Sequence, residues 1–130
     1  MIFVDTNLFM YAVGRPHPLR YPAREFLVEA NRNGTPLCTS AEVLHELAHA
    51  YLPAARIETL DSAMALIRRF RVEVWPLEEE DVTLARQLHE QYSGLSPRDL
   101  CHLASCRRRG VSEIKTFDQA LHAVAGARTR

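Results

Sequence analysis

The chain opens with the stretch MIFVDTNLFMYAVG, residues 1–14, which sets the pattern for the whole fold. Its first apolar run, residues 2–4, ends abruptly at Asp5, which predicts a short buried strand with an acid at its carboxyl end. Residues 8–13 are again apolar and are followed by Gly14, so a short helix is expected after the strand. A buried strand followed by a helix is the unit from which an α/β fold is built.

The rest of the chain alternates in the same way between strand-like and helical segments. Further strands are expected at 36–38, 72–75 and 114–116, and helices at 23–31, 39–53, 57–70, 82–92 and 97–110 and after Asp118. Such alternation predicts an α/β fold in which a central short parallel sheet is flanked by helices on both faces. The chain shows no repeat, low-complexity segment or internal linker, so residues 1–130 are expected to form a single domain.

Size and composition are those of an ordinary globular domain. The chain has 130 residues, of which 47% are hydrophobic and 25% charged, and this is enough to form a core without disulfide or zinc staples. The amino terminus lacks a secretory signal, and the sequence has no apolar stretch near the roughly 20 residues of a membrane span. We therefore expect a cytoplasmic protein with no membrane association. Sixteen basic residues balance sixteen acidic ones, so any nucleic-acid binding must come from local patches.

Four carboxylates are expected to meet at one edge of the sheet. Asp5 and Asp118 follow the first and the last predicted strands, where open α/β sheets form their sites. Asp99 lies in the first turn of a helix, and Glu46 lies beside the apolar face of another. Converging carboxylates repel one another, and a hard divalent cation such as Mg²⁺ is the usual compensation. Local roles are the alternative: helix caps for the two later aspartates and a solvated helix acid for the glutamate.

A competing metal motif surrounds Glu46. The segment HELAH, residues 45–49, is H-E-x-x-H on a predicted helix, the pattern in which two histidines bind zinc and the glutamate acts as a general base. A zinc hydrolase would leave the three aspartates unexplained, and no longer zinc-protease signature follows. On a later helix, Cys101, His102 and Cys106 are interpreted as buried thiols and a surface histidine rather than a metal cluster.

Four short motifs together resemble the PIN-domain family, and in particular its VapC-type toxins of type II toxin–antitoxin modules. They are MIFVDTN at 1–7, SAEVLHEL at 40–47, SPRDLCHLA at 96–104 and KTFD at 115–118, in an order and at spacings that span the chain. The resemblance implies that the acidic catalytic and metal site consists of Asp5, Glu46, Asp99 and Asp118. It places Thr6, Asn7 and Thr116 as the polar neighbours of that site.

The activity that the resemblance implies is an Mg²⁺- or Mn²⁺-dependent endoribonuclease that hydrolyses RNA phosphodiester bonds. Arg15 and Arg98 would anchor RNA phosphates. The implied partners are RNA, a small cognate antitoxin in a heteromeric complex, and a second copy of the chain in a homodimer. Two alternatives stay open, a degenerate PIN-like interaction module without catalysis and the zinc hydrolase. Members of the family usually close with a further strand, for which residues 124–130 are a poor match.

Overall fold

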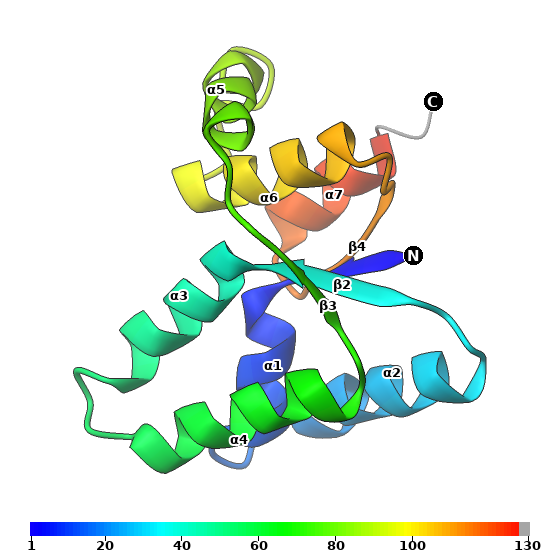
Figure 1. The fold of residues 1–130 in the computed structure, drawn as a ribbon, viewed down its shortest axis with the longest axis vertical. Coiled ribbons are helices and arrows are strands. Elements are labelled where there is room, and N and C mark those ends of the chain that lie inside the picture. The colour runs from blue at the N-terminus through cyan, green and yellow to red at the C-terminus, as the bar shows by residue number, and fades with distance from the viewer. Residues whose placement is uncertain (128–130) are drawn as a thin grey trace.

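The structure is a computed structural model, and it describes residues 1–127 (Figure 1). Its strands are β1 (Ile2–Val4), β2 (Leu37–Ser40), β3 (Glu73–Trp75) and β4 (Glu113–Lys115). Its helices are α1 (Thr6–Val13), α2 (Arg20–Arg32), α3 (Ala41–Tyr51), α4 (Ile57–Arg69), α5 (Glu79–Leu88), α6 (Pro97–Arg108) and α7 (Gln119–Ala127). Within these residues, no helix is long and apolar enough to cross a membrane.

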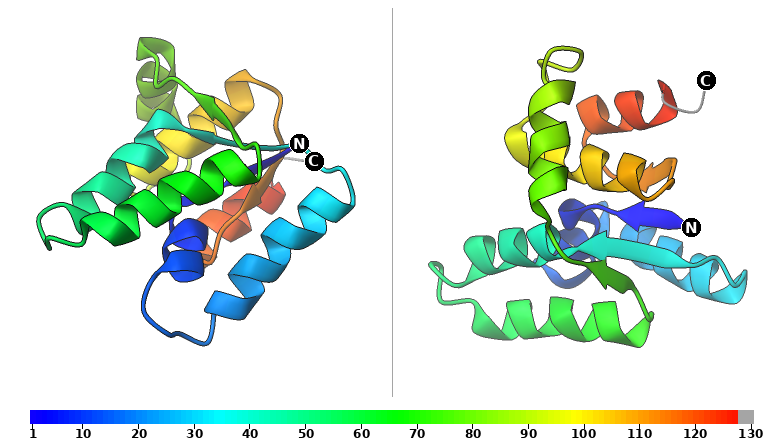
Figure 2. Two further views of the ribbon diagram at one scale, coloured as in Figure 1. Left: turned by 60° about the horizontal axis from the view of Figure 1, so that its bottom comes forward. Right: turned by 45° about the horizontal axis from the view of Figure 1, so that its top comes forward.

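The four strands form one parallel sheet in the order β3-β2-β1-β4. The opening strand β1 lies inside the sheet, where Phe3 is paired with Cys38 of β2 on one side and Ile114 of β4 on the other. Helices α1 to α4 cover one face and α5 to α7 the other (Figures 1 and 2). The predicted α/β fold with a parallel sheet between two helical layers is therefore confirmed.

The core forms around β1 because its side chains have helices on both sides. Phe3 and Val4 are fully buried, as are Leu8 of α1 and Leu103 of α6 on opposite faces of the sheet. The hydroxyl of Thr39 in β2 donates a hydrogen bond of 2.8 Å to the carbonyl oxygen of Val4, so a buried polar side chain ties the two strands together. This packing holds the carboxyl end of β1, and the acid that follows it, in a fixed position.

Several helix boundaries differ from those that the sequence predicts. Helix α2 begins at Arg20 rather than at residue 23 and so includes Pro22 in its first turn. A proline is tolerated there, because the backbone N–H groups of the first turn have no partner within the helix. Helix α3 is capped by Ser40, whose hydroxyl accepts from the backbone N–H of Val43, so the helix begins at Ala41 rather than at residue 39. Helix α5 is shifted toward the amino terminus relative to the expected 82–92 segment.

The end of the chain carries helix α7, which occupies part of the segment that matches a closing strand poorly. Within residues 1–127 no strand follows β4. Residues 128–130, the rest of that segment, lie outside the described part of the chain.

Helices α5 and α6 are joined by a buried polar cluster around Asp81. Its carboxylate is fully buried and accepts hydrogen bonds from the backbone N–H of Glu78 at 2.8 Å and from the guanidinium groups of Arg108 at 2.7 Å and Arg109 at 3.2 Å. Burial alone would raise the pKa of Asp81, but these donors outweigh it and hold the pKa below its usual range. The cluster fixes α5 against the helix that carries Asp99.

We expect Asp81→Ala to lower the free energy of unfolding by about 2 kcal/mol at pH 7. This loss is smaller than that expected when a fully buried ion pair is broken, because both arginines are partly exposed. An acid whose pKa is lowered in the folded state contributes stability above its unfolded pKa, near 4, and loses it as the pH falls through the folded value. The difference in the free energy of unfolding between wild type and variant, measured by urea titration, should therefore become smaller below about pH 4. Glu90→Ala, which breaks an exposed pair with Arg86, is the control and should change little.

Candidate active site

The site lies at the carboxyl end of the sheet, and Asp5 is its most constrained member. Asp5 directly follows β1, caps helix α1 and is only 4% exposed. One carboxylate oxygen accepts the backbone N–H of Thr6 at 2.7 Å, and the other accepts the hydroxyl of Thr116 at 2.6 Å. Two donors on different segments thus fix the orientation of this carboxylate.

A small polar network connects the segment after β4 to helix α1. The Thr116 hydroxyl, which donates to Asp5, accepts from the Asn7 side chain at 3.2 Å and from the backbone N–H of Asp118 at 2.9 Å. The Asn7 side-chain oxygen accepts the backbone N–H of Phe117 at 3.1 Å. The residues expected as polar neighbours therefore hold Asp5 and position the loop that carries Asp118.

Asp99 reaches the site from the first turn of α6. Ser96 caps this helix, because its hydroxyl accepts the backbone N–H of Asp99 at 3.1 Å. The Ser96 side chain also forms a hydrogen bond with the Asp99 carboxylate, which favours the ionised acid. Burial raises the pKa of Asp99, and the negative charges of Asp5 and Asp118 raise it further. A raised pKa means that the ionised carboxylate lacks a sufficient positive partner in the protein alone.

His102 is the residue that sequence reasoning placed wrongly. It was expected on the helix surface, but it is buried, and its ring packs against that of Phe3 at a centroid distance of 5.3 Å. Its Nε2 lies 2.8 Å from a Glu46 oxygen and 3.6 Å from an Asp5 oxygen. The available signal was its spacing from Asp99, because residues three apart share a helix face and this face of α6 turns toward the site.

The protonation of this pair follows from its surroundings. Burial would raise the pKa of Glu46, but the hydrogen bond and charge of His102 and the charge of Arg98 outweigh it and lower the pKa. Burial would lower the pKa of His102, but the bond to Glu46 and the carboxylates of Asp5, Glu46 and Asp99 raise it. Because Glu46 is ionised, the Nε2 atom of His102 carries the proton of the shared bond.

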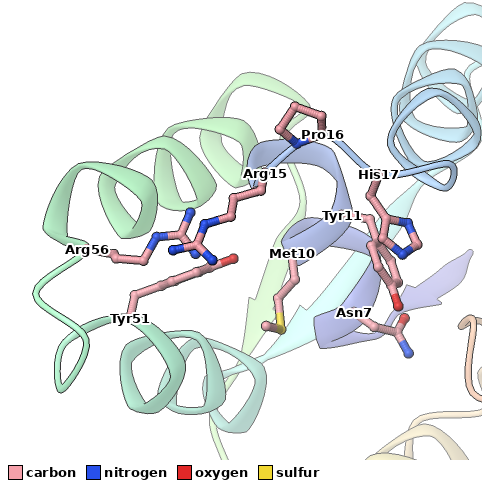
Figure 3. A pocket seen from close by; sticks show the side chains of 9 residues that line it. Asn7, Met10, Tyr11, Arg15, Pro16, His17, Tyr51 and Arg56 are labelled. Atoms are coloured by element: carbon pink, nitrogen blue, oxygen red, sulfur yellow. The ribbon is translucent and has the colours of Figure 1, made fainter.

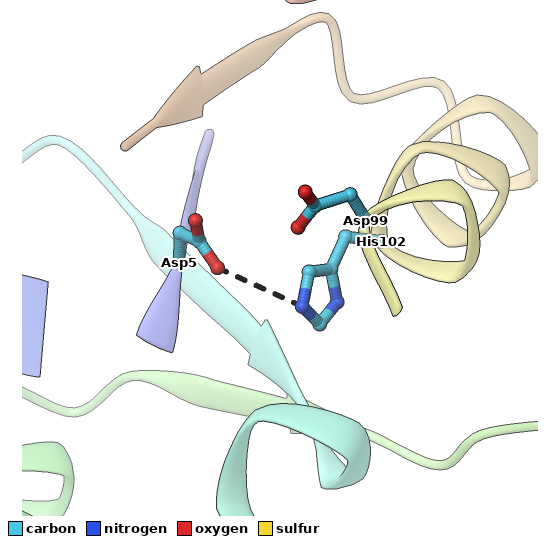
Figure 4. A group of neighbouring side chains, drawn as sticks. All are labelled: Asp5, Asp99 and His102. Atoms are coloured by element: carbon cyan, nitrogen blue, oxygen red, sulfur yellow. Dashed lines mark ion pairs between the residues drawn. The ribbon is translucent and has the colours of Figure 1, made fainter. Parts of the chain in front are cut away.

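These contacts bring three of the expected acids together, and the fourth lies at the rim. Ligand atoms of Asp5, Asp99 and His102 all lie within 4.8 Å of one another (Figure 4). Glu46 joins them through His102, whereas Asp118 is exposed, caps α7 through Leu121 and adds negative charge near Asp99. The oxygen donors and the unbalanced charge of Asp99 fit a hard divalent cation such as Mg²⁺ or Mn²⁺.

The zinc-binding alternative fails on geometry, since α3 points its glutamate and its histidines in different directions. Glu46 faces the site with its side chain 15% exposed, whereas the His45 side chain is 77% exposed and lies 3.9 Å from Glu42. His49 is exposed as well. Among residues 1–127, the only group of three or more possible metal ligands is the one formed by Asp5, Asp99 and His102.

The two arginines expected to contact substrate lie at different distances from the acids. The Nε atom of Arg98 is 3.9 Å from a Glu46 oxygen, and its side chain is 56% exposed at the rim of the site. Arg15 lies in the loop after α1 and lines a separate pocket, of which Asn7 is also a lining residue. Both arginines are exposed to solvent.

Comparison with known proteins agrees with this architecture. A family model described as the PIN domain matches residues 2–127. Ribonuclease VapC23 of Mycobacterium tuberculosis is 59% identical over 121 residues, covering 93% of this chain and 95% of that protein. Ribonuclease VapC13 of the same species is 36% identical over 126 residues, covering 97% and 96%. The chain therefore belongs to the PIN-domain family, in its VapC-type branch.

Solved structures show the same fold at low sequence identity. VapC20 of Mycobacterium tuberculosis, a toxin that cleaves the sarcin–ricin loop, gives a TM-score of 0.78 at 20% identity over 95% of both chains. A chain of the FitAcB structure from Neisseria gonorrhoeae gives 0.71 at 18% identity, covering 97% of this chain and 94% of its own. The VapBC2 structure from Rickettsia felis, bound to a promoter DNA fragment, gives 0.68 at 16% identity, covering 91% and 88%.

Proposed function

We propose that this chain is a metal-dependent endoribonuclease and the toxin of a toxin–antitoxin pair. The observation that carries the proposal is the convergence of Asp5 and Asp99 with His102 and Glu46 at the carboxyl end of the sheet. The relatives with 59% and 36% identity are named ribonucleases, which supports RNA as the substrate. The balanced net charge of the chain is compatible with this role, because the acids of the site lie together at the carboxyl end of the sheet and Arg98 lies near Glu46.

Asp5 and Asp99 would hold an Mg²⁺ or Mn²⁺ ion through carboxylate oxygens. When bound, the ion supplies Lewis-acid chemistry, since it lowers the pKa of a water molecule and offsets charge on the phosphate. Thr6 and Thr116 keep Asp5 oriented toward that position through their hydrogen bonds.

Glu46 would orient the attacking water and take up its proton. The hydrogen bond from His102 holds one oxygen of Glu46 in place, and Arg98 lies near the other. In-line attack of this water would form a new P–O bond and break the bond from phosphorus to the 3′ oxygen, which takes up a proton from solvent. The products are a 5′-phosphate and a 3′-hydroxyl end, so no side-chain nucleophile is required. Asp118 at the rim would complete the site or serve a second ion. Arg98 and Arg15 would bind the phosphates on either side of the cut.

The acidic site also suggests the chemistry of a protein partner. An antitoxin that places an arginine or lysine among Asp5, Glu46 and Asp99 would supply the positive charge that Asp99 lacks. The VapBC2 and FitAcB structures, which share this fold, support such a partner. We further propose a homodimer and a cytoplasmic location.

Purified protein should cleave single-stranded RNA with Mg²⁺ or Mn²⁺ and should not cleave it with EDTA. The physical reason is that the carboxylates by themselves repel a phosphate, and the cation reverses that charge. Gel analysis of end-labelled RNA gives both the cleavage and the end chemistry. Binding of Mn²⁺ without any cleavage would contradict the nuclease and favour a non-catalytic PIN module. Cleavage that persists in EDTA would contradict metal dependence.

A further inference from the structure

A second feature lies next to the acidic site and shares only Asn7 and Arg15 with the residues that serve the proposed cleavage. It is a pocket of about 280 Å³ between helix α1, the loop that follows it, the end of α3 and the start of α4. The pocket begins at Asn7, whose side chain is bonded to Thr116 and through it to Asp5. Asn7 therefore lies between this pocket and the acidic site.

One side of the pocket is basic. Arg15 and Arg56 both point into it, and Arg56 lies over the ring of Tyr51 at 5.3 Å from the centroid (Figure 3). Neither arginine forms an ion pair or a side-chain hydrogen bond within residues 1–127, whereas all three arginines of α6 do. The described residues that line the pocket include no carboxylate. An anion is thus the ligand that its charge favours.

The opposite side is aromatic. The ring centroids of Tyr11 and His17 lie 4.4 Å apart, with the rings tilted by 33°. The Tyr11 and Phe117 rings meet edge to face, with their centroids 5.6 Å apart. Met10 lies between the aromatic and the basic sides and gives the pocket an apolar surface (Figure 3). Flat aromatic groups beside arginine forks are the combination that binds single-stranded nucleic acid, because the rings stack on bases and the guanidinium groups bind phosphates.

We propose that this pocket is a subsite for one nucleotide of single-stranded RNA beside the scissile phosphate. Arg15 and Arg56 bind a phosphate of that nucleotide, and its base stacks on the pair formed by Tyr11 and His17. This inference rests on the proposed ribonuclease function. It adds the class of ligand and the residues that would give the enzyme a preference for unpaired RNA at the cut.

The test measures RNA binding without cleavage. Fluorescence anisotropy follows a labelled single-stranded RNA 12-mer as it binds chains that carry Asp99→Asn, with Arg56→Gln or His17→Ala added in turn. Each addition should weaken binding about ten-fold, in keeping with the loss of one stacked base or one phosphate contact. Arg32→Gln is the matched control, because Arg32 is exposed at the end of α2 and pairs with Glu29, and this chain should bind RNA like the parent.

An abasic scan of the same RNA identifies the stacked base. Removal of one base beside the cut should weaken binding to the parent and cause no further loss in the His17→Ala chain. Equal affinity of the Arg56→Gln and Arg32→Gln chains would overturn the proposal. The proposal would also be overturned if the Arg56→Gln and His17→Ala chains kept their affinity for RNA but bound a co-expressed protein partner more weakly. That result would assign the pocket to the protein partner. If the wild type binds RNA through the pocket but does not cleave it, the proposed nuclease activity is contradicted, whereas the proposed RNA subsite is not.

Discussion

Asp99→Asn should lower the rate of RNA cleavage by more than about a hundred-fold while the protein stays folded. Loss of a residue that merely orients a metal ligand costs about 10- to 100-fold, so loss of a ligand charge should cost more. The change keeps the shape of the side chain, and Ser96 can still cap the helix through the backbone N–H of residue 99. Initial cleavage rates of end-labelled RNA at saturating Mn²⁺ measure the effect.

The same variant separates activity from stability. The pKa of Asp99 is raised by burial and by the charges of Asp5 and Asp118, so its ionised form is unfavourable in the protein without a cation. A neutral asparagine removes that repulsion, and we expect the thermal unfolding midpoint of the metal-free protein to stay equal or rise. A large fall in that midpoint would contradict this account of the site, because it would give Asp99 a structural role.

Expression of the chain alone in a bacterial host should stop growth, and Asp5→Asn should restore it. The Asp5 carboxylate is held by two donors that would orient it toward a cation, so its charge cannot be replaced by a neighbour. Co-expression of the cognate antitoxin should also restore growth, since a basic side chain among the carboxylates would exclude the cation. Colony counts with matched protein levels give the readout. Normal growth with abundant soluble wild-type protein would contradict the toxin assignment.

The parts of the fold that depend on local sequence could be predicted. The strand that ends at Asp5 and the Ser96 cap are each defined by a few adjacent residues. The left-handed residue Gly34, with a φ of +68°, follows α2 where the Asn33-Gly34 pair predicts a helix end. The limits of β2 could not be predicted, because Thr39 is polar and becomes part of a buried strand only through its bond to Val4.

The candidate site could be predicted in part for the same reason. The three aspartates follow from their positions at the ends of local elements, and Glu46 follows from its place beside an apolar helix face. The family resemblance points to the same four acids. His102 could not be placed, because a histidine on an amphipathic helix is buried or exposed according to what packs beside it. Only the structure shows that it faces three carboxylates from two other segments and its own helix.

The most direct test compares RNA cleavage by Asp5→Asn with cleavage by His49→Ala, both in Mn²⁺ and both checked for folding by circular dichroism. Asp5 lies in the acidic site, whereas His49 belongs to the zinc-like motif and is exposed on α3. The account predicts that Asp5→Asn abolishes cleavage and that His49→Ala cleaves like the wild type, since imidazole is a poor ligand for hard cations. A folded but inactive His49→Ala beside an active Asp5→Asn would contradict it.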